Sequence, residues 1–338
     1  MGIVRSGYRV LKEEGPAALA VKGSKYITAE SKNTVRKRLL NYPRNRLFQR
    51  THGPAVDVME QDWDLLIILD ACRYDIFAET VDIDGELSSI ISKGSHSEEF
   101  CAAHFANRKH HDTVYVTANG YGARIGSESF HNLIFTDEDD SVPDVEVKHS
   151  TITGLVPSTV VGAAVDANIN YPNKRMIVHF MQPHMPYLGS RADELRRRVE
   201  DEGLVVRSRD PEKIGKYDTD EANVVSGLDG AFREGYITES ELREIYVENL
   251  EIVLEHVEEL MNEVDGKVVI TSDHGEHLGE NGLAGHFKYK YTEELRIVPW
   301  LVVDNGPRPT ITEEEPGTSA TVSQDAIEER LQNLGYKE

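Results

Sequence analysis

Five short apolar runs recur along the chain, each without the alternation of apolar and polar residues that marks a half-exposed strand. They are LLIILD at 65–70, TVYVTAN at 113–119, RMIVHF at 175–180, KVVITSD at 267–273 and IVPWLVV at 297–303. Runs this short and this apolar are typical of strands that are buried on both faces of a parallel sheet. The pattern therefore predicts a central sheet that is mostly parallel.

A long amphipathic helix is predicted just before the fourth run. Apolar residues recur at helical spacing between Leu242 and Val264. The segment TESE at 238–241 has the form of a capping box, and Gly266 follows the last apolar position. A helix that leads into an apolar strand is half of a βαβ unit, so the fold class is α/β with helices on both faces of the sheet.

The same patterns predict the domain organisation. Residues 1–55 form a basic N-terminal arm with short amphipathic pieces, and residues 56–310 form the α/β domain. Within that domain, the charge-rich residues 188–237 are expected to form a helical, exposed insertion that acts as a lid. Residues 311–338 form a tail that ends in a helix.

Charge divides the chain in the same way. Residues 1–50 contain 12 Lys and Arg against 3 Asp and Glu, whereas the rest contains 25 against 56. An acidic body repels phosphate backbones, which excludes nucleic acid as the main partner. With only 15 lysines, the acidic surface suits a halophilic protein or, alternatively, an ordinary acidic one. Residues 1–50 are expected to bind an anionic membrane surface or to pack on the acidic body.

The cysteines and the apolar segments of the chain bear on where in the cell the protein is located. Cys72 and Cys101 form no C-x-x-C pair, and no N-terminal run resembles a secretory signal. No window approaches the length and apolarity of a membrane span. These features predict a cytoplasmic protein, peripheral at the inner face of the membrane.

Candidate chemistry gathers where the apolar runs end. Asp70 and the pair Asp273-His274 follow two of the runs, and His184 follows another by a few residues. Carboxyl ends of parallel strands meet at one edge of a sheet, so these side chains are expected to converge there. Two carboxylates and an imidazole suit one divalent cation, with Zn or Mn favoured over Ca or Mg. Glu276 is expected to orient His274.

Four blocks carry a resemblance to a known family. LLIILDACRYD, QPHMPYLG, VVITSDHGEHLGENG and GHFKYKYTEELRIVPWLVV resemble, in order, the blocks of the alkaline phosphatase superfamily. The nearest branch is the sulfatase-like one, which includes lipoteichoic-acid synthases and phosphoethanolamine transferases. The resemblance covers about residues 62–305.

The resemblance implies an enzyme that hydrolyses or transfers an anionic ester group. It implies one metal ion, bound by Asp70, Asp273 and His274 beside a nucleophilic hydroxyl, and it implies roles for further residues. Ser97 is the expected nucleophile and metal neighbour, with Ser95 as the alternative. His184 and His286 are expected to contact the transferring group, with Lys288 as a further anion contact.

Other interpretations remain open. The C/S-x-P/A-x-R block of formylglycine sulfatases is absent near the nucleophile, which favours a phosphate ester over a sulfate ester; a sulfatase is the alternative. A further alternative is an inactive, anion-binding member of the fold, and His277 is an additional ligand candidate. Ser95 and Ser97 also suit the start of a helix at Glu98, since Ser95-x-x-Glu98 matches a capping box. The substrate is expected to be a lipid-linked or glycan ester, or else a soluble one.

Overall fold

The computed structural model describes residues 42–126, 128–136, 146–147, 155–207 and 224–316. The chain divides into two compact units, Met1–Pro54 and Ala55–Glu338. In the first unit, the described residues form α2 (Tyr42–His52), where the rings of Phe48 and His52 stack with centroids 4.3 Å apart. Residues 1–41 lie outside the described part, so the predicted membrane contact of the basic arm stays a prediction.

An eight-stranded sheet forms the centre of the second unit, in the order β2-β12-β9-β1-β6-β3-β4-β5. All five apolar runs form strands of this sheet. The strands are β1 (Leu65–Leu69), β2 (Glu86–Ile91), β3 (His110–Thr117), β4 (Phe130–Phe135), β5 (Glu146–Val147), β6 (Arg175–Phe180), β9 (Gly266–Thr271) and β12 (Ile297–Asn305). The predicted fold class, a mostly parallel sheet in an α/β domain, is confirmed.

The direction of one strand differs from the prediction. Strand β12 pairs antiparallel with both β9 and β2, whereas β1, β6, β9, β3 and β4 pair in parallel. An apolar run indicates burial but not strand direction, because direction is set by how the connection returns to the sheet. Between β9 and β12 the chain forms β10 (His277–Leu278), the 3-10 helix η4 (Glu280–Gly282), β11 (Ala284–Gly285) and the short helix α10 (Glu293–Arg296).

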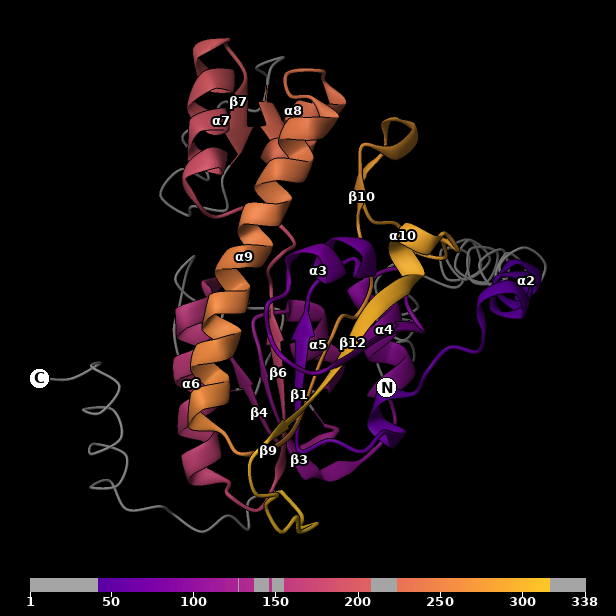
Figure 1. The fold of residues 1–338 in the computed structure, drawn as a ribbon, viewed down its shortest axis with the longest axis vertical. Helices are drawn as coiled ribbons and strands as arrows, with labels where there is room; N and C mark the ends of the chain where they lie inside the picture. Colours follow the sequence, from indigo (N-terminus) through magenta and orange to yellow (C-terminus); the bar gives the residue numbers. More distant parts are fainter. Residues whose placement is uncertain (1–41, 127, 137–145, 148–154, 208–223, 317–338) are drawn as a thin grey trace, which may run out of the picture. The chain divides into compact units, whose positions relative to one another are not determined.

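Helices cover both faces of the sheet, as predicted. In β1, Leu65, Ile67 and Leu69 belong to one apolar cluster, and Leu66 and Ile68 to another. The first cluster includes side chains of α3 (Tyr74–Thr80), α6 (Pro157–Asn170) and α9 (Glu239–Glu263), and the second includes those of α4 (Ser97–His104) and α5 (Gly120–Gly126). Figure 1 shows α6 and α9 side by side on one face. Since β1 is buried on both faces, its apolar run needs no alternation.

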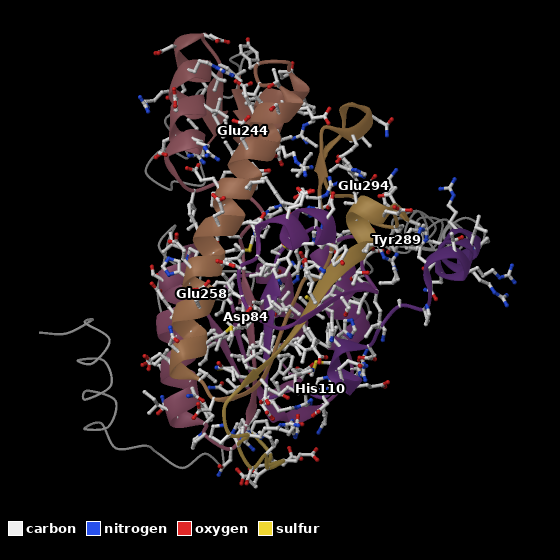
Figure 2. The ribbon with its side chains drawn as sticks, in the orientation of Figure 1. Asp84, His110, Glu244, Glu258, Tyr289 and Glu294 are labelled. Atoms are coloured by element: carbon white, nitrogen blue, oxygen red, sulfur yellow. The ribbon has the colours of Figure 1, made fainter. Side chains whose placement is uncertain are left out.

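Helix α9 begins as the sequence predicts. The Thr238 hydroxyl accepts the Glu241 N–H, and the Glu241 carboxylate accepts the Thr238 N–H, which completes the capping box. The helix ends at Glu263, and Gly266 then starts β9 with φ of +121°. Glu244 and Glu258 lie on the exposed side of α9, where they add to the acidic surface (Figure 2).

The region predicted as a helical insertion contains strands as well as helices. It forms α7 (Ser190–Asp201), β7 (Val205–Arg207), β8 (Val224–Ser226) and α8 (Gly227–Arg233), and β7 pairs in parallel with β8. Residues 208–223 and the predicted tail helix lie outside the described residues, so the lid role and the domain boundaries stay predictions. Among the described residues, no helix is both long enough and apolar enough to cross a membrane.

Candidate active site

Two buried carboxylates and an imidazole meet at the carboxyl edge of the sheet. Asp70 follows β1, and Asp273 and His274 follow the neighbouring strand β9. Ligand atoms of the three side chains all lie within 4.8 Å of one another. Each side chain is at most 2% exposed. The parallel pairing of β1 and β9 thus joins residues that are some two hundred positions apart.

The polar atoms of this trio lack enough partners within the protein. Among the described residues, Asp70 Oδ1 and Asp273 Oδ2 are buried without a hydrogen bond. The His274 Nε2 lies 3.6 Å from Asp70 Oδ1 and 3.4 Å from Asp273 Oδ2. Burial, reinforced by the charge of Asp273, raises the pKa of Asp70. Two buried carboxylates with unsatisfied oxygens are costly without a counter-charge, so the trio fits a divalent cation.

The tautomer of His274 also fits a metal ligand. Its Nδ1 lies 2.9 Å from the carbonyl oxygen of Gly275. Because a carbonyl can only accept, Nδ1 carries the proton and Nε2 directs a lone pair towards the two carboxylates. Burial lowers the pKa of His274 to about 3, which keeps the ring neutral.

Ser97 lies beside this trio. It is the first residue of α4, and its Oγ is 3.2 Å from His274 Nε2 and 3.4 Å from Asp70 Oδ2. The predicted helix start at Glu98 with Ser95 as its cap is wrong. The N-cap is His96, whose Nδ1 accepts the Glu98 N–H at 3.1 Å.

Ser95 lies in a different hydrogen-bond network. Its Oγ is 2.9 Å from both a carboxylate oxygen of Glu99 and the carbonyl oxygen of Phe287, and it accepts the Lys290 N–H at 3.0 Å. These bonds tie the segment after His286 to α4. A hydroxyl that already has these partners is a poorer nucleophile candidate than that of Ser97.

A second group lies across the site. His184, Glu276 and His286 have ligand atoms within 4.8 Å of one another. The His286 Nδ1 lies 3.1 Å from Glu276 Oε1. Burial opposes the charged form of His286, but the Glu276 carboxylate prevails and raises its pKa to about 9. The side chains that were expected to contact the transferring group therefore lie together.

The partner of Glu276 differs from the prediction. Glu276 contacts His286, whereas the proton of His274 faces a backbone carbonyl. The reason is the small hairpin of β10 and β11, which pairs His277 with Gly285 and so brings positions 276 and 286 side by side. His277 lies outside both groups, with Nδ1 3.9 Å from a Glu280 carboxylate oxygen.

Lys288 is engaged elsewhere. Its ammonium pairs with the Glu98 carboxylate and lies 5.7 Å from the centre of the Tyr121 ring. The predicted anion contact of Lys288 therefore requires the ammonium to leave Glu98.

A cavity of about 400 Å³ connects these groups. Its lining includes Asp70, His96, Ser97, Asn119, His184 and His286. Asp273 and His274 lie behind the lining and are fully buried. The cavity is large enough for a tetrahedral anionic group and part of the molecule that carries it.

Sequence reasoning missed two residues beside the trio. Asn119 donates from Nδ2 to Asp70 Oδ2 at 2.5 Å, and His179 Nε2 lies 4.0 Å from Asp70 Oδ2 and 3.9 Å from Asp273 Oδ2. Asn119 ends the run TVYVTAN, so the strand-end argument that selected Asp70 also applied to it. His179 lies within a strand, where an imidazole gives no sign of its direction.

At Gly275 the backbone of Glu294 approaches so closely that no side chain fits. A Cβ at this position would lie 2.0 Å from the carbonyl oxygen of Glu294. The constraint at Gly275 is the lack of space for a side chain and not the backbone conformation, since Gly275 has no positive φ.

We expect Gly275→Ala to destabilise the protein by about 1–3 kcal/mol, because the backbone on one side must move. The measurement is urea unfolding. Gly162→Ala is the matched control, since Gly162 lies inside α6 with no atom near its Cβ position. There, alanine is expected to stabilise the helix by up to about 1 kcal/mol. Equal effects at the two positions would contradict the packing argument.

Comparison with known proteins finds similarity in fold. No protein-family model and no curated protein matches the chain. Among solved structures, the soluble domain of lipooligosaccharide phosphoethanolamine transferase A from Neisseria meningitidis is 14% identical, with a TM-score of 0.39, over 70% of this chain and 75% of that one. The C-terminal periplasmic domain of EptC from Escherichia coli, in complex with Zn, is 14% identical, with a TM-score of 0.42, over 75% and 77%. A 2-O GAG sulfatase is 13% identical, with a TM-score of 0.42, over 76% and 66%.

These structures are sulfatase-like members of the alkaline phosphatase superfamily, the branch that the sequence blocks resemble. The comparison corrects one prediction. The cytoplasmic location is contradicted, because similar transferase structures are periplasmic domains. That prediction relied on the lack of a recognisable signal and on few cysteines, and neither absence reports where a protein works.

Proposed function

We propose that this protein is a metal-dependent enzyme that hydrolyses or transfers a phosphoryl group through a Ser97 nucleophile. One observation carries the proposal: the Ser97 hydroxyl lies within 3.4 Å of two members of a buried trio in which one oxygen of each carboxylate lacks a hydrogen-bond partner among the described residues. A nucleophilic hydroxyl beside a cation site is the arrangement that ester cleavage by covalent catalysis needs.

Asp70, Asp273 and His274 would hold the cation. When bound, a divalent ion there supplies Lewis-acid chemistry, which lowers the pKa of a neighbouring hydroxyl and neutralises charge on the ester. An imidazole among the ligands favours Zn or Mn over Ca or Mg.

The protein's own residues account for the remaining steps. Ser97 loses its hydroxyl proton to solvent, and its Oγ attacks the phosphorus in line, so that a P–Oγ bond forms while the bond to the leaving oxygen breaks. His286, charged through its pair with Glu276, lies across the site beside His184 and supplies a donor to the phosphoryl oxygens and a proton to the leaving oxygen. Water, or an alcohol acceptor, then attacks the phosphorus and loses a proton, while the P–Oγ bond breaks and Ser97 Oγ takes up a proton.

A panel of chromogenic esters tests the proposal. Purified protein is loaded with Zn or Mn and assayed on p-nitrophenyl phosphate, bis-p-nitrophenyl phosphate and p-nitrophenyl sulfate. We expect cleavage of a phosphate ester that EDTA abolishes and added metal restores. Cleavage of the sulfate alone favours the sulfatase alternative, and binding of phosphate without cleavage favours the inactive one. A lipid-linked ester belongs in the panel, since the basic residues 1–50 suit work near an anionic surface.

Glu276→Gln is expected to lower kcat/KM by about 10-fold or more, because His286 loses the charge that orients it and stabilises its proton. Metal content is expected to stay unchanged, since Glu276 lies outside the Asp70 trio. In a His286→Ala background the same substitution is expected to cost little further, which a double-mutant cycle measures. Additive losses would contradict the assignment of Glu276 to His286.

A further inference from the structure

His96 stands immediately before the proposed nucleophile and caps the helix that carries it. Its Nδ1 accepts the Glu98 N–H at 3.1 Å. A nitrogen that accepts a hydrogen bond carries no proton, so the ring is neutral and its proton resides on Nε2. The capping bond thereby selects one tautomer of His96.

Two neighbouring imidazoles have the opposite arrangement. The Nδ1 of His274 faces the Gly275 carbonyl at 2.9 Å, and that of His184 faces the Met185 carbonyl at 2.7 Å. Both are therefore protonated at Nδ1, and in the neutral ring each directs a lone pair from Nε2. A lone pair can bind a metal or accept a proton, whereas an N–H can do neither.

The His96 ring is held in place from two sides. Its centroid lies 5.0 Å from that of Tyr121 and 4.9 Å from that of His286, both in edge-on geometry. His96 and Ser97 both line the cavity. Among the described residues, none accepts a hydrogen bond from His96 Nε2. An aligned donor that needs no rearrangement is the kind of group that stabilises a developing oxyanion.

We propose that His96 binds the substrate directly, with Nε2–H donating to an oxygen of the tetrahedral anionic group that Ser97 attacks. This inference rests on the proposed function. Phosphoryl and sulfuryl oxygens only accept hydrogen bonds, so they match an N–H and not a lone pair. Of the imidazoles of His96, His184 and His274, that of His96 is therefore the one that can donate a hydrogen bond into the cavity from a neutral ring.

The capping role alone does not require histidine. Serine, asparagine and aspartate are the usual N-cap residues, and each accepts the same backbone N–H. Histidine satisfies the cap with Nδ1 and leaves the other ring nitrogen, Nε2, for the cavity that His96 lines. This double use separates the two roles experimentally.

The test compares His96→Ser with His96→Ala in the metal-loaded protein. Serine keeps the cap and removes the donor, whereas alanine removes both. We expect kcat/KM to fall by about 10²-fold in both variants and the affinity for inorganic phosphate, measured by calorimetry, to fall by about 10-fold. Only His96→Ala is expected to lose thermal stability as well. If His96→Ser keeps wild-type activity and phosphate affinity, His96 is a cap only and the proposal is wrong.

A second measurement reads the tautomer in the metal-free protein. Long-range ¹H–¹⁵N correlation spectra are expected to contain one Nε2-protonated histidine signal that disappears in His96→Ser, and an Nδ1-protonated signal for His274. An Nδ1-protonated His96 would overturn the proposal.

The outcomes also separate this inference from the proposed function. If wild-type protein binds phosphate through His96 but cleaves no ester, the proposed enzymatic activity is contradicted and the proposed contact between His96 and the anion is supported. An active wild type with an equally active His96→Ser would contradict the anion contact alone. Wild-type protein that neither binds phosphate nor cleaves an ester would contradict both.

Discussion

Replacing Ser97 by alanine is expected to lower phosphate-ester cleavage by about 10³-fold or more, because the substitution removes the hydroxyl that lines the cavity beside Asp70 and His274. The effect should appear in kcat, since the substitution leaves the cavity and the imidazoles in place. Steady-state kinetics with the best ester of the panel measures it. Metal content and the melting temperature should stay close to those of the wild type, because the Ser97 hydroxyl caps no helix.

Ser95→Ala is the matched control, because Ser95 is also buried and lies only two positions away. Its hydroxyl contacts Glu99, Phe287 and Lys290, so we expect a loss of about 1–3 kcal/mol in stability. Activity, measured below the lowered melting temperature, should stay within a few-fold of the wild type. The reverse result, an active Ser97→Ala and an inactive Ser95→Ala, would assign the nucleophile to Ser95.

Replacing Asp70 by asparagine is expected to change stability in opposite directions with and without metal. In the metal-free protein, the Asp70 and Asp273 carboxylates are buried together, and the pKa of Asp70 is raised by burial and by that neighbour. Removing one charge should therefore stabilise the metal-free protein by about 1 kcal/mol or more. Thermal unfolding in EDTA measures this gain.

With metal present, the order should reverse. Wild-type protein gains about 2.7 kcal/mol when the free metal is at 100 times its Kd, whereas Asp70→Asn is expected to bind the ion poorly and gain little. Activity should fall by about 10³-fold. A variant that melts at the same temperature with EDTA and with metal, while the wild type responds, would meet the prediction. A full metal response in Asp70→Asn would exclude Asp70 from the site.

Asp57→Asn is the control for the direction of the stability change that follows when a buried carboxylate loses its charge. Lys93 and Arg108 bond to the Asp57 carboxylate and, against its burial, lower its pKa. The charge of Asp57 therefore stabilises the folded protein at neutral pH. A carboxylate whose pKa is lowered on folding contributes stability above its unfolded-state pKa, and this contribution is lost as the pH falls through the folded-state pKa. Asp57→Asn should therefore destabilise the protein equally with and without metal.

A feature of the fold could be predicted from the sequence where the residues that determine it lie close together in the chain. The β1 and β9 runs were found because burial on both faces leaves an unbroken apolar signal, and α9 because its capping box involves neighbouring residues. The direction of β12 was not found, since an apolar run is the same in either direction. The insertion at 188–237 was predicted helical because its short strands carry too few residues for a period-2 pattern.

By itself, the sequence determined the α/β class and the strand-end positions of Asp70, Asp273 and His274, because each depends on local patterns and on the rule that parallel strands end at one edge. Only the tertiary structure placed Ser97, and not Ser95, beside the trio, paired Glu276 with His286 and assigned the tautomer of His96. Those choices depend on which backbone groups and side chains meet across the hairpin and the start of α4. Contacts between residues distant in sequence leave no periodic signal in the chain.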